Sequence, residues 1–192
     1  MEVKNKRLYH IHRNYNMDNL WKTGSSLLID NNFQSVYFAK LLVHDNELKE
    51  RYGSNYDIDF IIAMMEEMIF KGMLDEEAIV IFNRLKVLRR EQALEEGRKL
   101  YNPSAPQRFH SIYLTDKEDL EYWKECVGDN CFKEYLLEIS GNLFKSSDTL
   151  FPDESLMLDR QIEESKKYWN PTERQLLLRK EYLFQGQVQI IK

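Results

Sequence analysis

The sequence predicts an α+β fold, because strand-like segments open and close the chain and helix-like segments fill most of its first half. Residues 8–12 alternate between apolar and polar side chains, as a half-buried strand does. Residues 57–73 place six apolar side chains on one helical face, namely Ile58, Ile61, Ile62, Met65, Met68 and Ile69. After Pro103 and Pro106, which end the helical half, short β-like segments return. Strands and helices that are segregated along the chain in this way are typical of α+β proteins.

Three helices are expected between the first strand and the two prolines. Residues 24–30 suit a turn or a short strand, and the next residues change to helical spacing. This spacing of apolar residues predicts helices over residues 33–43, 57–73 and 76–101. The charged run at residues 89–99 predicts that the second half of the last helix is solvated.

The elements expected after the prolines alternate between short strands and helices. They are a strand at residues 108–115, a helix that opens at residues 115–118 and runs to residue 127, strands at 132–140 and 142–145, a helix at 155–169, and strands at 181–184 and 187–191. A capping box of Thr115 and Glu118 predicts the start of the first helix. Gly141 is expected to separate one pair of strands and a turn at Gly186 the other. Asn170 ends the second helix and suits the start of a further short one.

The composition favours a single domain over residues 1–192. Hydrophobic residues make up 43% of the chain and aromatic residues 12%, which is enough apolar surface for a core. The chain has 27 Lys and Arg against 32 Asp and Glu, a net charge of −5. This balance excludes a global positive field that attracts nucleic acid or an anionic membrane.

The sequence also predicts a soluble, cytoplasmic protein. The first 13 residues contain no apolar run suited to a signal peptide, and no later run is long enough to span a bilayer. In such a chain Cys126 and Cys131 are expected to be reduced thiols rather than a disulfide.

Three apolar segments carry polar side chains of chemical interest. They are Tyr9 and His10 in the first segment, Arg108, Ser111 and Tyr113 in the second, and Glu181 in the third. A polar group buried in a strand needs a hydrogen-bond partner or a function. Taken singly, His10 reads as a core histidine bonded to the backbone, and Tyr113 as an aromatic anchor. Their order along the chain is more informative.

Taken in order, the three segments resemble the ADP-ribosyltransferase superfamily, in the branch built on a His, Tyr and Glu triad. Residues 8–10 look like the first strand of that branch, residues 111–115 like its second motif, and residues 181–188 like its closing Glu strand. The run at residues 94–101, followed by Pro103 and residues 108–113, is similar to a small family of uncharacterised bacterial ADP-ribosyltransferase-like proteins. This resemblance covers most of the chain.

The resemblance implies a fold and a substrate. The fold is an ADP-ribosyltransferase-like split β core, in which residues 31–101 form a mainly helical insertion that covers one side. The substrate is NAD, bound without a metal in a cleft between the N-terminal strand and the last ones. Members of the superfamily often bind NAD without a Gly-rich phosphate loop. The absence of a Gly-x-Gly-x-x-Gly motif therefore argues only against a Rossmann domain.

The resemblance also implies roles for the triad. Cleavage of the nicotinamide–ribose bond creates an oxocarbenium-like cation, which a carboxylate beside the ribose stabilises. Glu181 is expected to be this catalytic carboxylate. Tyr113 is expected to stack on the nicotinamide, and His10 to hydrogen-bond the ribose on the adenosine side. Tyr9, beside His10, is expected to help bind NAD.

Four further residues are weaker candidates for the NAD site. A guanidinium suits phosphate in bidentate geometry, so Arg108 or Arg13 is a candidate for the pyrophosphate. Ser111 either bonds nicotinamide or braces its strand. Gln189 alternates in phase with Glu181 across the expected turn and is a candidate for the same pocket, the alternative being an edge-strand side chain that faces water.

Competing motifs are weak. Cys126, Cys131, His110 and His12 are ligand types for zinc, but the Cys spacing is wider than in a zinc knuckle and no second pair follows. The pairs Glu66–Glu67 and Glu95–Glu96 diverge around their helices and read as solvated faces, not as glycosidase carboxylates. The three Trp residues and the stripe of Met64, Met65, Met68 and Met73 suit either the core or a partner groove, and the core is favoured.

The sequence therefore predicts an enzyme, a mono-ADP-ribosyltransferase that passes ADP-ribose to an intracellular macromolecule, whether protein, RNA or DNA. The resemblance suggests a bacterial toxin or anti-phage effector that a neutralising antitoxin protein holds in check. One alternative is a catalytically silent NAD-binding or toxin-control protein, because Lys180 precedes Glu181 and glutamines stand at 185, 187 and 189, where many members carry a further acid. The other alternative is an NAD glycohydrolase, with water as acceptor.

Overall fold

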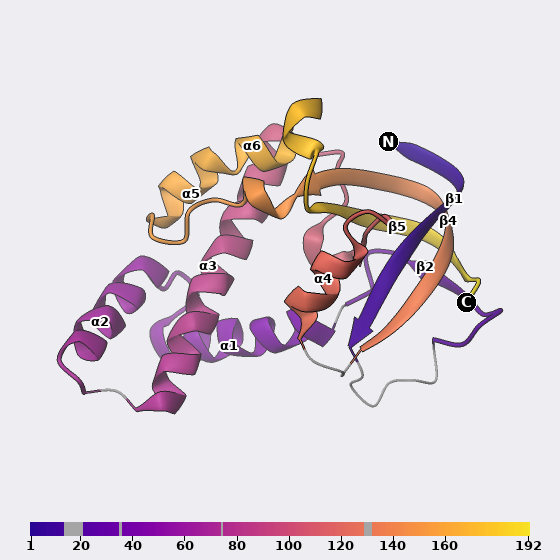
Figure 1. Cartoon of the computed structure of the whole chain (residues 1–192). Helices are drawn as coiled ribbons and strands as arrows, with labels where there is room; N and C mark the ends of the chain where they lie inside the picture. Colours follow the sequence, from indigo (N-terminus) through magenta and orange to yellow (C-terminus); the bar gives the residue numbers. More distant parts are fainter. Residues whose placement is uncertain (14–20, 35, 74, 129–131) are drawn as a thin grey trace.

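The computed structural model describes residues 1–13, 21–34, 36–73, 75–128 and 132–192. The strands are β1 (Glu2–Arg13), β2 (Ser26–Ile29), β3 (Ile112–Leu114), β4 (Phe132–Ser147) and β5 (Lys180–Ile190). The helices are α1 (Val36–Tyr52), α2 (Ile58–Phe70), α3 (Glu76–Tyr101), α4 (Leu120–Val127), α5 (Leu158–Glu164) and α6 (Lys166–Trp169). Figure 1 shows α1 to α3, α5 and α6 gathered on one side of the molecule and the curved strands on the other. The expected α+β class is confirmed.

The strands form one antiparallel sheet that curls toward a closed ring. The pairing order is β1-β4-β5-β2, and β3 also pairs with β5. A bridge between Tyr9 and Thr115 then joins β3 to β1, so that pairing runs around the circuit β1, β4, β5, β3 and back to β1. Apolar side chains from all five strands pack against one another inside this curl, among them Leu8, Leu114 and Phe184.

Each of the two long strands runs through a glycine at which the sequence predicted a break. β4 continues through Gly141 and β5 continues through Gly186, and the two glycines are direct partners in the β4–β5 ladder. A Cβ atom on Gly141 would lie 2.5 Å from the carbonyl oxygen of Gln185 and 2.8 Å from the Cα atom of Gly186. Both glycines have positive φ, 152° and 144°. They therefore permit a close backbone approach inside a strand rather than a turn.

The helices of the first half are confirmed, with corrected ends. α2 and α3 begin after the N-caps Asp57 and Asp75, whose carboxylates accept hydrogen bonds from the backbone N–H groups of Phe60 and Ala78. α1 begins at Val36 and runs to Tyr52, later at both ends than the expected helix over residues 33–43. No helix in the described residues is long and apolar enough to cross a membrane.

The second half of α3 is not solvated, as the sequence predicted, but contains buried charges. Arg89, Glu91 and Arg98 are each less than 10% exposed. The cause is α5 and α6, which lie along α3, where Trp169 Nε1 donates a hydrogen bond to the carbonyl oxygen of Leu94 at 2.7 Å. The Glu95 side chain is also largely covered and pairs with Arg98. A run of charged residues on a helix therefore does not show that the helix is exposed, because a distant segment of the chain can cover it.

The predicted capping box before α4 does not form. The carboxylate of Asp116 accepts hydrogen bonds from the N–H groups of Glu118 and Asp119, both at 3.2 Å, and α4 starts only at Leu120. The Asp119 carboxylate instead receives the N–H groups of Arg179 and Lys180 at 3.0 Å. A carboxylate expected inside the first turn of a helix thus fixes the start of β5.

Three further expectations are corrected in detail. The expected strand at residues 108–115 begins as a 3₁₀ turn, Arg108–His110, and only Ile112–Leu114 form a strand. The short helix expected at Asn170 is a 3₁₀ turn, Glu173–Leu176, capped by Thr172. Met64 and Met73 are exposed rather than in the core, whereas Trp21 and Trp169 are buried as expected.

We predict that Gly97→Ala destabilises the protein, although Ala in an open helix is about 1 kcal/mol better than Gly. A Cβ atom on Gly97 would lie 1.8 Å from Ser165 Oγ and 2.9 Å from Ser165 Cβ, so α6 would have to move away from α3. Urea denaturation should show a loss of about 1–3 kcal/mol, typical of overpacking. Glu96→Ala, on the exposed side of the same turn, should change stability by less than about 0.5 kcal/mol. A gain in stability for Gly97→Ala would contradict the close contact.

Candidate functional site

The three segments singled out in the sequence lie side by side in the fold. Tyr9 and Thr115 exchange backbone hydrogen bonds of 2.8 and 2.9 Å, which join β1 to β3. β3 then pairs with β5, with Tyr113 opposite Leu183. Strand pairing therefore brings residues from near the beginning, the middle and the end of the chain into one region.

A small pocket of about 80 Å³ lies at this junction. Its lining residues come from β1, β3, α4 and β5, and they are Tyr9, Ile11, Tyr113, Leu114, Thr115, Trp123, Val127 and Glu181. Three of the predicted site residues, Tyr9, Tyr113 and Glu181, thus share one pocket. Aromatic and aliphatic side chains make up most of its wall, and Glu181 is its acidic group.

His10 does not line this pocket, because successive side chains of a strand point to opposite faces. Its ring stacks on Trp21 at 4.5 Å between centroids, inside the curl of the sheet. Its Nδ1 donates a hydrogen bond of 2.9 Å to the backbone carbonyl of Tyr113. Burial lowers the pKa of the imidazole to about 4, although the bond to the carbonyl acts in the opposite direction. At neutral pH His10 is therefore an uncharged link between β1 and β3.

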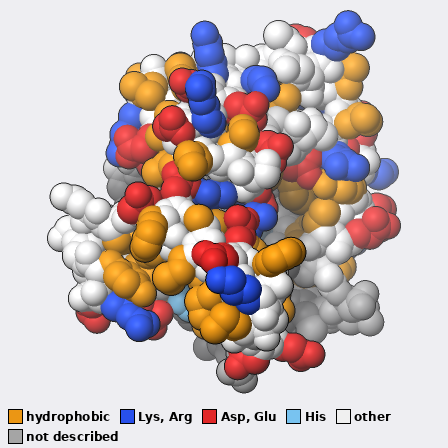
Figure 2. Space-filling model, turned by 90° about the vertical axis from the view of Figure 1, so that its left-hand side faces the viewer, with side chains coloured by type: hydrophobic (Ala, Val, Ile, Leu, Met, Phe, Trp, Pro, Cys, Tyr) orange, Lys and Arg blue, Asp and Glu red, His pale blue; other side chains and the backbone are white. Residues whose placement is uncertain are grey.

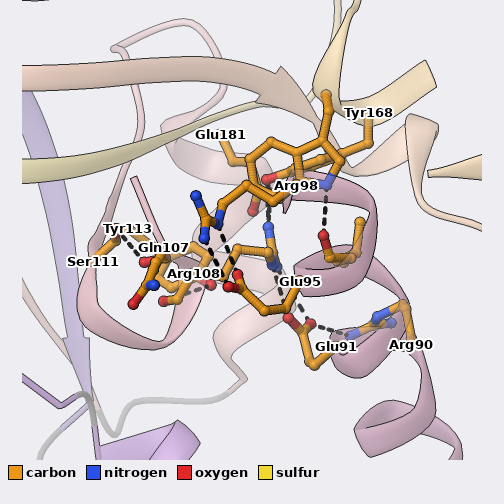
Figure 3. Close-up of polar contacts among 12 residues, drawn as sticks. Arg90, Glu91, Glu95, Arg98, Gln107, Arg108, Ser111, Tyr113, Tyr168 and Glu181 are labelled. Carbon is orange, nitrogen blue, oxygen red and sulfur yellow. Dashed lines mark hydrogen bonds and ion pairs between the residues drawn. The ribbon is translucent and has the colours of Figure 1, made fainter. Parts of the chain in front are cut away.

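Arg108 occupies the centre of a buried polar cluster directly behind the pocket. Its Nε donates to Glu91 Oε2 at 2.8 Å, and its Nη1 donates to Glu181 Oε1 at 2.6 Å and to the hydroxyl of Tyr168. The Tyr168 hydroxyl in turn donates to Glu181 Oε1. Figure 3 shows Arg108 between Glu91 on α3, Tyr168 on α6 and Glu181 on β5. We call these four residues the Arg108 cluster.

The Arg108 cluster is almost closed to water. The four residues are between 0% and 4% exposed, so each charge depends on its partners instead of solvent. The rings of Tyr113, Phe151 and Tyr168 also face the guanidinium, each with its centroid 5.1 Å from the central carbon. Arg108 is thus held by ion pairs at its edge and by aromatic rings at its faces.

The charges of the cluster sustain one another. Burial lowers the pKa of Arg108, but the charges of Glu181 and Glu91 outweigh it and hold that pKa above its ordinary value. Burial raises the pKa of Glu91, but Arg108 and then Arg90 reverse this and leave the pKa below its ordinary value. Burial holds the pKa of Tyr168 well above its ordinary value, so the hydroxyl keeps the proton that it donates to Glu181.

Glu181 belongs to both the cluster and the pocket. The hydrogen bonds that it receives from described residues all reach Oε1. Within the described residues, Oε2 receives none of these hydrogen bonds. Lys180, the neighbouring residue, points the other way and pairs with Asp116 at 3.1 Å and Glu118 at 2.5 Å.

Ser111 and Arg108 are not among the described residues that line the pocket. The Ser111 hydroxyl donates to the carbonyl of Gln107 at 2.7 Å and so braces a turn. Arg108 is only 3% exposed, and its guanidinium donates hydrogen bonds to Glu91 and Glu181. Little of the guanidinium is therefore accessible to a pyrophosphate. The side chain of Arg13, like Cys131, lies outside the described residues. Within the described chain, no group of three or more His, Cys, Asp or Glu residues is arranged to hold a metal ion.

Gln189 does not share a pocket with Glu181, in contrast to the prediction. β5 is continuous, so eight steps along the strand, at about 3.3 Å each, place Gln189 about 26 Å from Glu181. Gln189 instead lines an open groove of about 470 Å³ on the sheet, together with Ser140 and Gln187. The predicted turn at Gly186 would have brought the two side chains together, and that turn does not form.

Sequence reasoning missed three residues of the site. Glu91 stood in a run that was read as solvated, and Tyr168 stood in a helix with no link to the triad segments. Trp123 lines the pocket from α4 and donates its Nε1 hydrogen to the carbonyl of Lys180 at 2.8 Å. One signal was available for Glu91, because it lies three residues from both Leu88 and Leu94 and so shares an apolar stripe of the helix with them.

We predict that Arg108→Met destabilises the protein by about 3–5 kcal/mol, because it leaves the buried carboxylates of Glu91 and Glu181 without their counter-charge. Arg7→Met is the matched control. Arg7 pairs with Glu138 at 3.4 Å on the surface, where its side chain is 65% exposed, so its loss should cost less than about 1 kcal/mol. Equal losses for the two variants in urea denaturation would mean that the Arg108 cluster does not carry this stability.

Comparison with known proteins places the chain in a family without assigning an activity. No curated protein matches the chain. The sequence model of the family described as "Protein of unknown function (DUF2441)" matches residues 8–192. This span contains every residue of the pocket and of the Arg108 cluster. The chain therefore belongs to the DUF2441 family.

Proposed function

We propose that this protein is a mono-ADP-ribosyltransferase that cleaves NAD and transfers ADP-ribose to an intracellular macromolecule. One observation carries the proposal. Tyr9, Tyr113 and Glu181, from the three segments that resemble the His-Tyr-Glu branch of the superfamily, line one pocket. Their positions in the sequence are far apart, so it is the pairing of β1, β3 and β5 that joins them. The split β core of that superfamily is part of the proposal.

In the proposed reaction the pocket takes the nicotinamide end of NAD. Its volume of about 80 Å³ is well below the roughly 300–1,000 Å³ of sites that enclose whole ligands, so it suits one ring rather than a dinucleotide. The rings of Tyr9 and Tyr113 provide flat faces for stacking. The rest of NAD then lies outside the pocket, along β1 and β3.

Glu181 is the proposed catalytic residue. As the bond to nicotinamide breaks, positive charge develops on the ribose, and a carboxylate oxygen beside it stabilises that charge. Arg108 and Tyr168 hold Oε1, which fixes the orientation of the carboxylate and directs Oε2 to the ligand. The largely apolar wall keeps water away, so this electrostatic stabilisation is stronger than in solvent.

His10 takes a different part in this proposal from the one that the sequence suggested. Because it bonds the backbone carbonyl of Tyr113, it positions β3 relative to β1 and so positions the Tyr113 ring. Direct contact between His10 and the adenosine-side ribose remains a prediction. The acceptor of ADP-ribose, whether protein, RNA or DNA, and a neutralising antitoxin likewise remain proposals, as does a role as a toxin or anti-phage effector.

A second candidate function is a catalytically silent protein of the same fold. Glu181 is only 4% exposed and already has two partners within the protein, which suffices for a purely structural role. An NAD glycohydrolase differs from the transferase only in using water as acceptor. Incubation with labelled NAD, with and without cell lysate, separates the three. A transferase labels a macromolecule, a glycohydrolase releases nicotinamide without labelling, and a silent protein does neither.

We predict that Glu181→Gln lowers the rate of nicotinamide release about a hundredfold. The amide keeps the shape of the side chain but removes the charge that the transition state requires, so the loss falls on turnover and NAD affinity stays within about threefold. Turnover and the dissociation constant for NAD are measured separately on the folded variant.

Glu91→Gln is the matched control for that substitution. It also removes one carboxylate from Arg108, but Glu91 lies on α3 behind the guanidinium, apart from the described residues that line the pocket. Both variants should lose stability, and only Glu181→Gln should lose most of its turnover. Equal activity in the two folded variants would exclude Glu181 as the catalytic carboxylate.

A further inference from the structure

Helix α2 is apolar on the side that faces solvent as well as on the side that faces the protein. Ten of its 13 residues are apolar. Ile58, Ile61 and Ile62 pack inward against the other helices. On the opposite side Phe60 and Met64 lie one turn apart, and the exposed Phe70 lies at the C-terminal end of the helix. A helix that is apolar all round is normally covered on all sides.

Apolar side chains that follow α2 in the chain, before and within the first turn of α3, are exposed as well. Phe60 is 66% exposed and Phe70 is 90% exposed. We define the α2 surface as Phe60, Met64, Phe70, Met73, Ile79 and Val80, all of which are exposed. In Figure 2 this side of the molecule faces the viewer, and hydrophobic side chains gather in its lower half with both acidic and basic ones among them. An apolar surface of this kind with a polar rim marks an interaction site.

The rim of the α2 surface is strongly acidic. Residues 57–77 contain seven Asp and Glu residues and one lysine, Lys71, which already pairs with Glu67 at 2.5 Å. One of these acids, Asp59, pairs with the buried Arg89 at 2.6 Å, so the other six acids and Lys71 give the rim a formal charge of −5, equal to that of the whole chain. All other residues together are nearly neutral, so the negative charge of the protein is concentrated around the exposed apolar side chains.

An apolar surface with an acidic rim favours some classes of partner over others. A second copy of the chain would bring an equally acidic rim against the first, and an anionic membrane would repel it. A basic partner is instead attracted by the negative electrostatic potential of the acidic rim. An exposed helix surface that carries Phe and Met side chains fits the apolar face of another helix, if the cationic residues of that second helix lie beside the acidic rim.

We propose that the α2 surface docks a basic amphipathic helix of a partner protein. The apolar face of that helix covers Phe60, Met64 and Phe70, and its Lys or Arg side chains meet acidic residues such as Glu66 and Glu76. This surface lies on the helical part of the fold, away from the β1, β3 and β5 junction, so the inference is independent of the proposed catalytic function.

The proposal is tested with an 18-residue fluorescent peptide of Leu and Lys arranged as an amphipathic helix. Fluorescence anisotropy should show binding to the full chain, weakening as salt is added. A scrambled peptide of the same composition and an amphipathic peptide of Leu and Glu should each bind at least tenfold more weakly. These two controls separate docking from charge attraction alone and from apolar contact alone.

Variants then locate the binding. Phe60→Ser with Phe70→Ser should weaken binding at least tenfold, whereas Leu177→Ser with Leu178→Ser, which removes two leucines that are each 68% exposed elsewhere, should leave it within twofold. Glu66→Lys with Glu76→Lys changes only exposed charges and should also weaken binding at least tenfold.

Three outcomes would overturn the proposal. They are an absence of peptide binding, equal binding by the scrambled peptide, and binding that persists in both the Phe and the Glu variants. A concentration-dependent dimer that Phe60→Ser with Phe70→Ser abolishes would assign the surface to a second copy of the chain instead.

Discussion

The buried guanidinium of Arg108 is the constraint on which the rest of the arrangement depends. A charge that is 3% exposed persists only with partners, and Arg108 takes them from three different elements, namely Glu91 on α3, Tyr168 on α6 and Glu181 on β5. The ion pairs therefore fix the helical layer against the sheet. The same contacts orient the carboxylate of Glu181 at the wall of the pocket, so stability and site geometry have a common origin.

This common origin explains why Glu181 supports two interpretations. As a partner of Arg108 it is structural, and as the acidic group of an otherwise mainly apolar pocket it is suited to stabilise a developing cation. The two roles use different atoms, since the protein's donors reach Oε1. Glu91 is therefore a useful comparison for Glu181, because it also pairs with Arg108 but is not among the described residues that line the pocket.

The sequence predicted best what depends on local pattern. α2 and α3 follow from the 3.6-residue spacing of apolar side chains and from the caps Asp57 and Asp75. Gly141 and Gly186 were read as breaks because a glycine looks the same in a turn and in a close strand crossing, and only pairing between distant strands distinguishes them. Glu91 and Tyr168 were missed because their burial depends on α5 and α6 folding back over α3. The resemblance identified Tyr9, Tyr113 and Glu181, whereas the direction of the His10 side chain follows from strand alternation in the fold.

The central claim is that the pocket at the junction of β1, β3 and β5 binds the nicotinamide end of NAD. A crystal structure of Glu181→Gln with NAD tests it most directly, because slow cleavage leaves the dinucleotide intact. The account predicts the nicotinamide ring between Tyr9 and Tyr113, with its ribose beside residue 181. Nicotinamide bound elsewhere, for instance in the open groove that contains Gln189, with the pocket unchanged, would contradict it.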